Sequence, residues 1–187
     1  FGSTVAEYQG LMYQWGRKDP FIGQGVYGYH YDHHAFTAPS DAISYVYYDS
    51  SNDTIENTVK NPTVAYNDAR WNGATDLWGY KKTKYDPCPV GWRVSDYAAW
   101  EGIQRSGNAN RQYVEISSPY STPTAYFPTA GGSEGDINIH WTNSAAHYWL
   151  TEYRQTYNLY WESSPNFGGW DVDYRLSVRC MKDDPTQ

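Results

Sequence analysis

The sequence is poor in aliphatic residues. Leu, Ile, Val and Phe together supply 27 of its 187 residues, about 14%. A strongly charged chain with less than roughly 20% of these residues is expected to be disordered. Here 9 Trp and 20 Tyr compensate, because an aromatic side chain buries roughly 150–250 Å² and can build a core. We therefore expect a folded domain with an aromatic core and many half-exposed rings.

Other scarcities exclude whole classes of protein. The chain has 14 Lys and Arg against 21 Asp and Glu, and the net charge of −7 argues against a nucleic-acid partner. No apolar run reaches the roughly 20 residues of a membrane span. The length fits a single domain, residues 1–187. The chain opens abruptly without a visible signal peptide, so we expect a trimmed fragment of a secreted protein.

Cysteine is also scarce, with only Cys88 and Cys180. Two cysteines are too few for a zinc cage without help from histidine. A disulfide between them would close most of the domain into one loop and stabilise it by roughly 4–5 kcal/mol. Two unrelated buried thiols are the alternative. We favour the bridge because the composition, rich in Tyr, Trp, Asn, Gly and Ser and poor in Lys, is typical of extracellular proteins.

Short strand patterns dominate the chain. Alternating, β-branched or aromatic residues occupy segments 10–17, 42–49, 111–117, 137–142, 149–153, 157–163 and 175–182. Clusters of Gly, Pro, Asn and Ser separate these segments. The pattern predicts an α+β fold with short antiparallel strands, one or two helices and much irregular loop.

Helix patterns are rare. The best one runs from Ser95, the expected N-cap, to a stop at Gly107, and Trp100 lies in its apolar stripe. A second, shorter helix is expected within residues 61–72, with Pro62 near its start.

No catalytic motif stands out. The chain lacks G-x-S-x-G and H-E-x-x-H, and it has no phosphate-binding loop. Glu152, Glu162, Asp171 and Asp173 could pair as in a glycosidase. Scattered carboxylates occur in every acidic protein, however, so the sequence predicts a protein that is not an enzyme.

Metal-binding patterns are weak as well. His30, Asp32, His33 and His34 cluster in "YHYDHH", but no second group follows at ligand spacing, and a solvated loop is the better interpretation. Residues 133–136 and 171–173 contain acidic turns that match no EF-hand spacing. We expect no metal and no cofactor, with structural calcium as the alternative.

The stretch 149–175 has an unusual composition. It holds seven Tyr and Trp but only three aliphatic residues, Leu150, Leu159 and Val172. Tyr and Trp provide rigid contact area at low entropic cost, and Asn, Ser and Gly add adaptable hydrogen bonds, as in antibody binding sites. This composition indicates binding rather than catalysis.

Three blocks in this order carry a resemblance: "GLMYQWGRKDPF" (10–21), "DLWGYKKTKYDPCPVGWRVSDYAAW" (76–100) and "YRLSVRCMKD" (174–183). They resemble FISUMP-type domains (Fibrobacter succinogenes major paralogous domain) of Bacteroidetes surface proteins and lipoproteins, some of them fimbrillin-like. The resemblance covers nearly the whole chain. Family members often carry an upstream W-x-D-R-N-L-G segment that is missing here, so we expect a domain truncated at its N-terminus.

The resemblance implies a C-type lectin-like fold. Such domains are also distant kin of formylglycine-generating enzymes and of variable proteins made by diversity-generating retroelements. Cys88 matches the family's cysteine ahead of the helix, and Cys180 matches that of the last strand. Nothing here matches a catalytic cysteine pair, so the resemblance implies no enzymatic activity. We expect both sulfurs in the core beside Trp92 and Trp100.

In retroelement-diversified relatives, mutagenesis favours Asn, Tyr, Asp, His and Ser just upstream of the final strand. The segment 143–174 is rich in these types. The resemblance thus implies a ligand-binding face at about residues 141–174. Its expected members are Asn143, His147, Tyr148, Tyr153, Arg154, Tyr157, Asn158, Tyr160, Trp161, Asn166, Trp170, Asp171, Asp173 and Tyr174.

The leading hypothesis is an extracellular module that binds a protein or glycan, on a bacterial surface, lipid-anchored in the full-length protein, or on a phage particle. A pilus or surface-assembly subunit is the alternative, and a glycosidase-like enzyme is the third hypothesis. Alternate residues of the stretch should point inward, with Trp149 and Leu159 in the core. Exposed rings are expected at Tyr153, Tyr157, Tyr160, Trp161 and Trp170.

Overall fold

The computed structural model describes residues 11–22, 26–27, 46–48, 60, 64–66, 76–110, 113–118, 121–133, 139–141, 144–160 and 163–184. The strands in these residues are β1 (Leu11–Gln14), β2 (Phe21–Ile22), β3 (Val26–Tyr27), β4 (Val46–Tyr48), β5 (Val64–Tyr66), β6 (Trp92–Val94), β7 (Gln104–Asn110), β8 (Tyr113–Ser118), β9 (Ser121–Pro128), β10 (Ile139–His140), β11 (Ala145–Trp149), β12 (Gln155–Tyr160), β13 (Asn166–Gly169), β14 (Arg175–Val178) and β15 (Cys180–Lys182). A short helix, α3, spans Tyr97–Trp100. The described part is therefore mostly β, with little helix.

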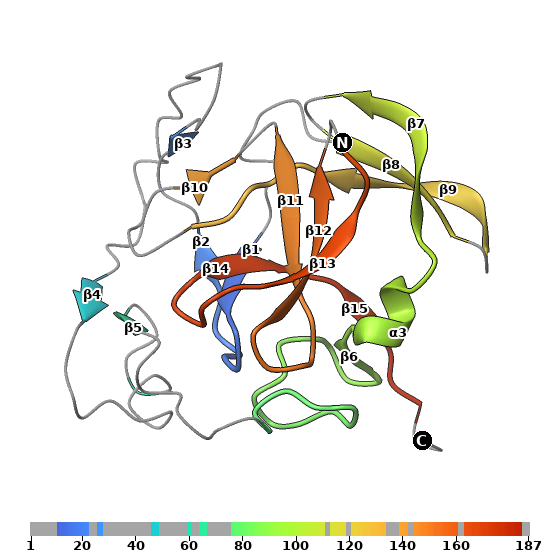
Figure 1. Cartoon of the computed structure of the whole chain (residues 1–187). Coiled ribbons are helices and arrows are strands. Elements are labelled where there is room, and N and C mark those ends of the chain that lie inside the picture. Colours follow the sequence, from blue (N-terminus) through green and yellow to red (C-terminus); the bar gives the residue numbers. More distant parts are fainter. Residues whose placement is uncertain are drawn as a thin grey trace.

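The largest sheet combines the two ends of the chain. Its six strands follow the order β13-β12-β11-β14-β1-β2, so the early strand β1 lies beside the late strand β14 (Figure 1). All neighbours are antiparallel except β11 and β14, which are parallel. This sheet carries most of the stretch whose composition indicated binding.

The remaining strands form smaller sheets. β7, β8 and β9 make a three-stranded antiparallel sheet, and β15 pairs antiparallel with β6. The pairs β10–β3 and β4–β5 are parallel. The prediction of short strands and much loop is confirmed. The expectation of antiparallel pairing holds for most, but not all, of the strands described.

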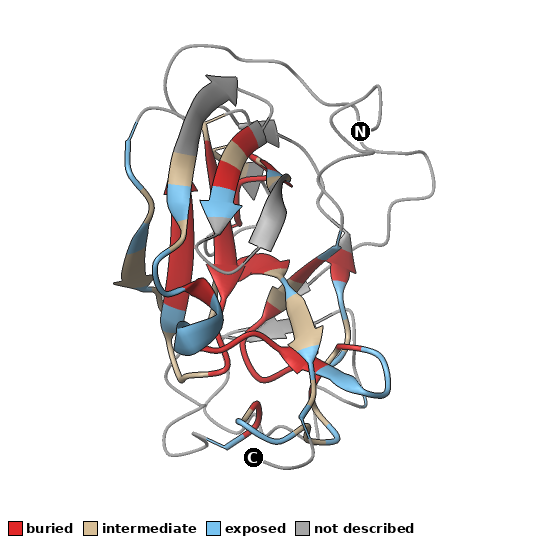
Figure 2. Cartoon of the chain, turned by 90° about the vertical axis from the view of Figure 1, so that its right-hand side faces the viewer, coloured by how far each residue is buried: buried red, intermediate tan, exposed pale blue. Residues whose placement is uncertain are grey.

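The core is aromatic, as the composition predicted. One cluster contains Trp15, Trp78 and Trp149, and a second is built around Trp100. Trp149 and Leu159 are both fully buried, which confirms their predicted place in the core. Figure 2 shows the buried residues concentrated in the strands at the centre of the molecule.

The helix differs from its prediction in both bounds. Asp96, and not Ser95, is the N-cap, because its side chain accepts a hydrogen bond from Ala99 N at 3.0 Å. The hydroxyl of Ser95 instead accepts one from the indole of Trp100 at 2.8 Å. The helix ends at Trp100 because the next residue, Glu101, is extended. Gly107, the predicted stop, lies in β7.

Two other segments also depart from expectation. The predicted strand at 149–153 is wrong beyond Trp149, since residues 151–154 form the turn between β11 and β12. The region 61–72 was expected to hold a short helix; its residues 64–66 form strand β5 instead, and the others lie outside the described residues. The patterns also missed β9 and β13, because Pro in β9 and Gly in β13 read as turn residues.

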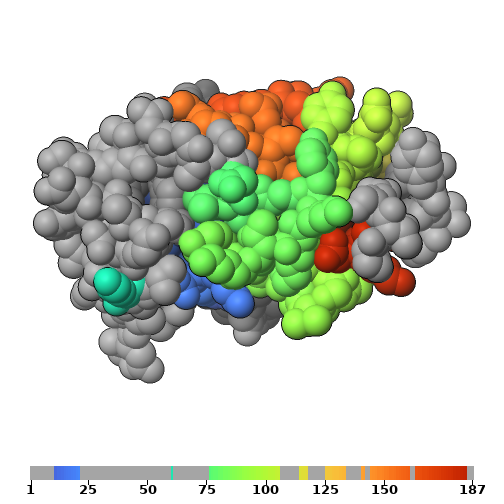
Figure 3. Space-filling view, turned by 90° about the horizontal axis from the view of Figure 1, so that it is seen from below, coloured from blue at the N-terminus to red at the C-terminus, as the bar shows by residue number. Residues whose placement is uncertain are grey.

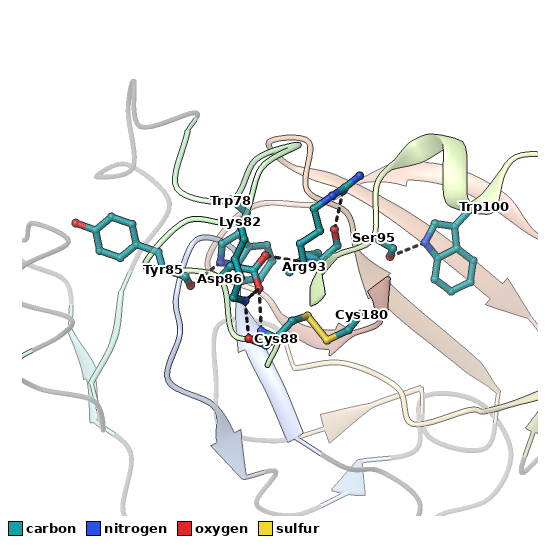
Figure 4. The surroundings of a disulfide bond; sticks show 10 residues. Trp78, Lys82, Tyr85, Asp86, Cys88, Arg93, Ser95, Trp100 and Cys180 are labelled. Atoms are coloured by element: carbon teal, nitrogen blue, oxygen red, sulfur yellow. Dashed lines mark hydrogen bonds and ion pairs between the residues drawn. A yellow bond between two sulfur atoms is a disulfide. The ribbon is translucent and has the colours of Figure 1, made fainter. Parts of the chain in front are cut away.

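The predicted disulfide is confirmed: Cys88 and Cys180 are bonded, with their Cα atoms 5.8 Å apart. Asp86 lies beside the bridge with no exposed surface. Its carboxylate accepts hydrogen bonds from Cys88 N at 2.8 Å and Val94 N at 2.9 Å, and it pairs with Lys82 at 2.9 Å (Figure 4). We call residues 76–100 together with β15 the disulfide region.

The surroundings of the bridge were only partly anticipated. Trp92 is 46% exposed, and Trp100 is buried in a different core cluster from the one that contains Cys88, so the expectation that these two rings flank the bridge is wrong. Cys88 lies in the core as expected, whereas Cys180 is only partly buried. Figure 3 shows that residues 76–100, in green, form the centre of the face seen from below. Val90 and Tyr80 are also exposed on this segment.

Candidate binding site

Three strands of the large sheet place a chain of polar side chains on one face. In the register of the sheet, His147 of β11 is opposite Asn158 of β12, which is opposite Asn166 of β13. The atoms Nδ1 of His147 and Oδ1 of Asn158 are 2.9 Å apart. Asn158 Nδ2 donates to Asn166 Oδ1 at 3.1 Å. We call this chain the polar ladder.

The ladder fixes the tautomer of His147. Because Asn158 uses its amide nitrogen as donor to Asn166, its oxygen faces His147 and can only accept. The hydrogen of the neutral imidazole must therefore lie on Nδ1, and Nε2 carries a lone pair. His147 is 1% exposed, and Nε2 has no hydrogen-bond partner among the residues that the structure describes.

Burial also fixes the charge of His147. Desolvation disfavours the imidazolium and lowers the pKa of His147 to about 4, although the hydrogen bond with Asn158 acts in the opposite direction. At neutral pH the site consequently contains an uncharged histidine with an unsatisfied acceptor.

Aromatic rings surround this histidine. Ring centroids lie 4.8 Å from His147 for Trp170, 5.5 Å for Trp141 and 5.8 Å for Tyr160. Trp170 also contacts Trp141 at 5.1 Å and Tyr174 at 4.6 Å, both in edge-to-face arrangements. These four rings are all partly exposed. We call Trp141, His147, Tyr160, Trp170 and Tyr174 the aromatic cluster.

The backbone of Trp141 is held in an unusual conformation. Its φ of 59° lies in the left-handed region, which bulky residues rarely adopt. Its carbonyl accepts hydrogen bonds from Ser144 N at 3.0 Å, Ala145 N at 2.9 Å and the Ser144 hydroxyl at 2.8 Å. Such over-determined strain is found preferentially at functional sites.

A tight turn carries the two remaining rings. Tyr174 N donates to Asp171 O at 3.1 Å, and Val172 between them is fully buried. The side chain of Gln14 reaches the carbonyls of Val172 and Asp173, at 3.4 Å each. The core thus anchors the middle of the turn, while Trp170 and Tyr174 reach the surface at its two ends.

The structure brings six predicted site residues together. The polar ladder and the aromatic cluster contain His147, Asn158, Tyr160, Asn166, Trp170 and Tyr174. Among the ladder residues, Asn166 is exposed, whereas His147 and Asn158 are buried. The alternation of strand residues is the physical reason for this grouping.

Tyr148 and Tyr157 point to the opposite face. They pack on Trp100, with centroids 5.4 Å and 4.6 Å from its ring. Both are buried, so the expectation of an exposed ring is wrong for Tyr157, which is 2% exposed. Desolvation raises the pKa of Tyr157 to about 12 and also raises that of Tyr148.

The other predicted site residues either lie apart from the aromatic cluster or are not among the residues that the structure describes. Tyr153 is partly exposed but packs edge-on against Trp15 of the core at 5.1 Å. Arg154 forms an ion pair with Asp171 at the margin of the cluster. Asp173 is partly exposed. Asn143 and Trp161 lie outside the described residues.

One member of the cluster was missed as a site residue. Trp141 is the first residue of the expected face, but it was not among the expected site residues. A left-handed backbone conformation determines where its ring lies. Only Gly and Asn usually indicate that conformation in a sequence. The single available clue was its position next to a stretch rich in Trp and Tyr.

The described residues hold no group of three or more His, Cys, Asp or Glu that could bind a metal ion. The cluster at His30, Asp32, His33 and His34 lies outside them. Of the suggested glycosidase carboxylates, Glu152 accepts hydrogen bonds from the Tyr80 hydroxyl at 2.9 Å and from Tyr97 N at 3.0 Å. Glu162 is not described.

In the part of the chain that the structure describes, no helix is long and apolar enough to cross a membrane. No protein-family model, curated protein or solved structure matches the chain.

Proposed function

We propose that this chain is an extracellular binding module and that the aromatic cluster is its ligand site. The observation that supports the proposal best is that three partly exposed Trp and Tyr rings contact a buried histidine with an unsatisfied acceptor, and a fourth, Tyr174, packs on one of them. Trp170 and Tyr174 pack against the core cluster that contains Trp15 and Trp149, but they keep part of their surface exposed, whereas Trp15 and Trp149 are fully covered. Trp and Tyr are also the residues most enriched where binding energy concentrates.

The disulfide fits an extracellular location, because bridges persist mainly in oxidising compartments. We assign the chain to the C-type lectin-like fold and to the FISUMP-type domains of bacterial surface proteins. Support comes from the bridge between the segment ahead of the helix and the last strand, and from the pairing of β1 with β14.

Retroelement diversification is part of this proposal. The candidate face is supplied by side chains of residues 141–174, whereas the disulfide region provides a bonded scaffold. The DNA around the gene tests the idea. A nearby reverse transcriptase and a template repeat that differs only at adenines would support it, and their absence from the native locus would contradict it.

Matched tryptophan variants test the binding site. Trp170→Ala removes a ring from the cluster, and Trp92→Ala removes an exposed ring from the disulfide region. Both proteins, and the unmodified one, are applied to arrays of purified extracellular proteins and of glycans. We expect Trp170→Ala to lose at least tenfold in affinity for any bound component and Trp92→Ala to retain it. The reverse pattern would overturn the proposal.

The edge of the sheet favours a second candidate, a surface-assembly subunit. β13 ends the six-stranded sheet within the described residues, and its sequence, Asn-Phe-Gly-Gly, carries little side-chain bulk. An edge strand of this kind can accept a strand from another copy. Sedimentation velocity over a wide concentration range tests this, since strand addition predicts concentration-dependent polymers and a binding module predicts monomers.

A further inference from the structure

We infer that the aromatic cluster takes a neutral sugar ring and that Nε2 of His147 accepts a hydrogen bond from one of its hydroxyl groups. The inference rests on the proposed function and names the class of ligand. It makes His147 a specificity-determining residue, which contacts the ligand directly.

The polarity of the site sets the first requirement. Nε2 holds a lone pair because the polar ladder places the imidazole hydrogen on Nδ1. A buried acceptor without a partner costs free energy, and a ligand that brings a donor recovers it. Burial keeps Nε2 unprotonated, with the pKa of His147 near 4. The ligand must therefore donate to His147.

The charges of the site and of the chain exclude further classes of ligand. A phosphate or carboxylate group has no donor for Nε2 when ionised, and the chain carries a net charge of −7, which repels anions. Aromatic faces attract cations, but a quaternary ammonium group carries no hydrogen that it could donate to Nε2. Arg154 and Asp171 at the margin of the cluster form an ion pair, which adds no net charge there. An uncharged ligand that donates a hydrogen bond therefore fits the aromatic cluster best.

The surrounding rings set the shape of the ligand. Indole and phenol rings offer apolar faces, and three of them contact the buried imidazole, whose Nε2 is an acceptor without a partner among the described residues. A pyranose combines an apolar C–H face with hydroxyl donors around its rim. A Tyr or Trp of a protein partner has only one donor, at one point of a flat ring.

Access to Nε2 requires one ring to move. Trp141 and Trp170 are the indoles that contact the imidazole. The carbonyl of Trp141 is held by three hydrogen bonds. Trp170 follows Gly168 and Gly169 at the sheet edge, and its amide makes one bond, to Arg154 O at 3.1 Å. Trp170 is therefore the ring that gives way when a ligand enters.

The test uses the unmodified protein with histidine labelled by ¹⁵N. The probes are methyl pyranosides of glucose, galactose and mannose, free N-acetylglucosamine, tetramethylammonium and inorganic phosphate. We expect at least one sugar to produce a saturable shift of the His147 Nε2 resonance, together with a change in tryptophan fluorescence. Because no variant is involved, this measurement does not depend on the folding of a mutant.

Two substitutions then separate the roles of the two nitrogens. His147→Asn keeps a donor near Nδ1 for Asn158 but removes the acceptor at Nε2, and it should weaken sugar binding at least tenfold. His147→Gln places an amide oxygen near the position of Nε2 and should weaken binding less. An equal effect of both variants, with the fold intact by circular dichroism, would overturn the role of Nε2.

The remaining outcomes distinguish this inference from the function on which it rests. No response to any sugar, or a response to tetramethylammonium alone, overturns the sugar assignment. A protein bound in a Trp170-dependent manner, without any sugar response, overturns it as well but leaves the binding site in place. Sugar binding that Trp170→Ala leaves unchanged would place the site elsewhere and overturn both.

Discussion

Asp86 in the disulfide region and His147 in the aromatic cluster are both buried ionisable residues, but their surroundings differ. Asp86 receives two backbone hydrogen bonds and an ion pair, so both of its oxygens are used. His147 uses one ring nitrogen and leaves the other unsatisfied among the described residues. Asp86 is hydrogen-bonded to β6, 8 residues away in the sequence, and His147 to β12, 11 residues away.

This difference in hydrogen bonding distinguishes the disulfide region, which we regard as the scaffold, from the aromatic cluster, which we propose as the binding site. In the disulfide region, the buried charges of Arg93 and Asp96 are paired at 2.6 Å, and Trp78 and Trp100 donate their indole hydrogens at 2.9 Å and 2.8 Å. Arg93 Nε makes no hydrogen bond, but it lies 3.7 Å from the carboxylate of Asp183. Satisfied groups of this kind stabilise one conformation. In the aromatic cluster, an unsatisfied nitrogen and half-covered rings leave free energy that a ligand can recover.

The largest expected effect concerns the bridge. The double substitution Cys88→Ala, Cys180→Ala should lower the free energy of unfolding by about 4–5 kcal/mol, because the unfolded chain regains the entropy of a long loop. Urea unfolding monitored by fluorescence measures the loss. Trp92→Ala, an exposed change in the same region, is the control and should cost much less.

Alkylation of the native protein without reductant gives an independent check of the bridge. The intact mass should not increase, since both sulfurs are bonded. Two added alkyl groups, or a loss below about 1 kcal/mol in the double variant, would show that the scaffold is held by other contacts.

The next effect is the pH dependence that His147 imposes. Its pKa is about 4 in the folded protein and about 6.5 in the unfolded chain. As pH falls from 6.5 to 4, the unfolded chain takes up a proton that the folded chain does not. Stability is therefore full above pH 6.5 and falls by roughly 3 kcal/mol across this window.

Urea unfolding at a series of pH values measures this loss. His147→Asn retains a donor to Asn158 but cannot titrate, so it supplies the background from the carboxylates. The difference between the two curves should grow as pH falls from 6.5 to 4. Parallel curves would mean that His147 titrates freely and that its nitrogen is not desolvated.

A smaller effect is expected at Gly168 on the edge strand. A Cβ atom there would lie 2.5 Å from Nδ2 of Asn158, inside the polar ladder. Gly168→Ala should therefore cost about 2 kcal/mol through overpacking. It should also disturb the His147 resonances. Gly79→Ala is the matched control, because its nearest contact would be 3.5 Å, and it should stay within about 0.5 kcal/mol.

Thermal or urea unfolding of the two alanine variants gives the comparison. Equal stability of the two proteins would indicate that β13 moves away to accept the methyl group. The polar ladder would then be a flexible element rather than a fixed one.

The smallest effect is expected for the ion pair at the margin of the cluster. The side chains of Arg154 and Asp171 are 41% and 49% exposed, so water and salt screen their attraction. Asp171→Asn should change the free energy of unfolding by less than about 1 kcal/mol, and the change should shrink in 0.5 M salt. A large loss of unfolding free energy that does not depend on salt would show that Asp171 behaves like the buried, hydrogen-bonded charges of the disulfide region.

Sequence patterns predicted some parts of this fold for clear physical reasons. Twenty tyrosines and nine tryptophans predicted an aromatic core, since nothing else in the chain has enough apolar surface. The bridge between Cys88 and Cys180 was predicted in preference to two free thiols because the composition is typical of extracellular proteins. The N-cap was placed one residue too early, because Ser95 and Asp96 are both good caps and only geometry selects between them.

The proposed binding face could be predicted from the sequence as a segment but not residue by residue. Tyr157 and Tyr160 have similar neighbours in the sequence, yet one packs on Trp100 and the other lies beside His147. Both faces of β12 carry apolar and polar residues, so the alternation predicts two groups without indicating which is inward. Trp141 was missed because no sequence pattern indicates that a tryptophan adopts the left-handed backbone conformation.

The sequence by itself determined the composition of the protein. It is an acidic, aromatic-rich chain with one cysteine pair and a segment whose composition indicates binding. Tertiary structure alone decided which rings meet, because the register of β11, β12 and β13 joins His147 to Asn158 and Asn166. The same register turns Tyr148 and Tyr157 into the core. The unsatisfied nitrogen of His147 results from these strand pairings, since its tautomer depends on Asn158 of the next strand and not on its immediate neighbours along the chain.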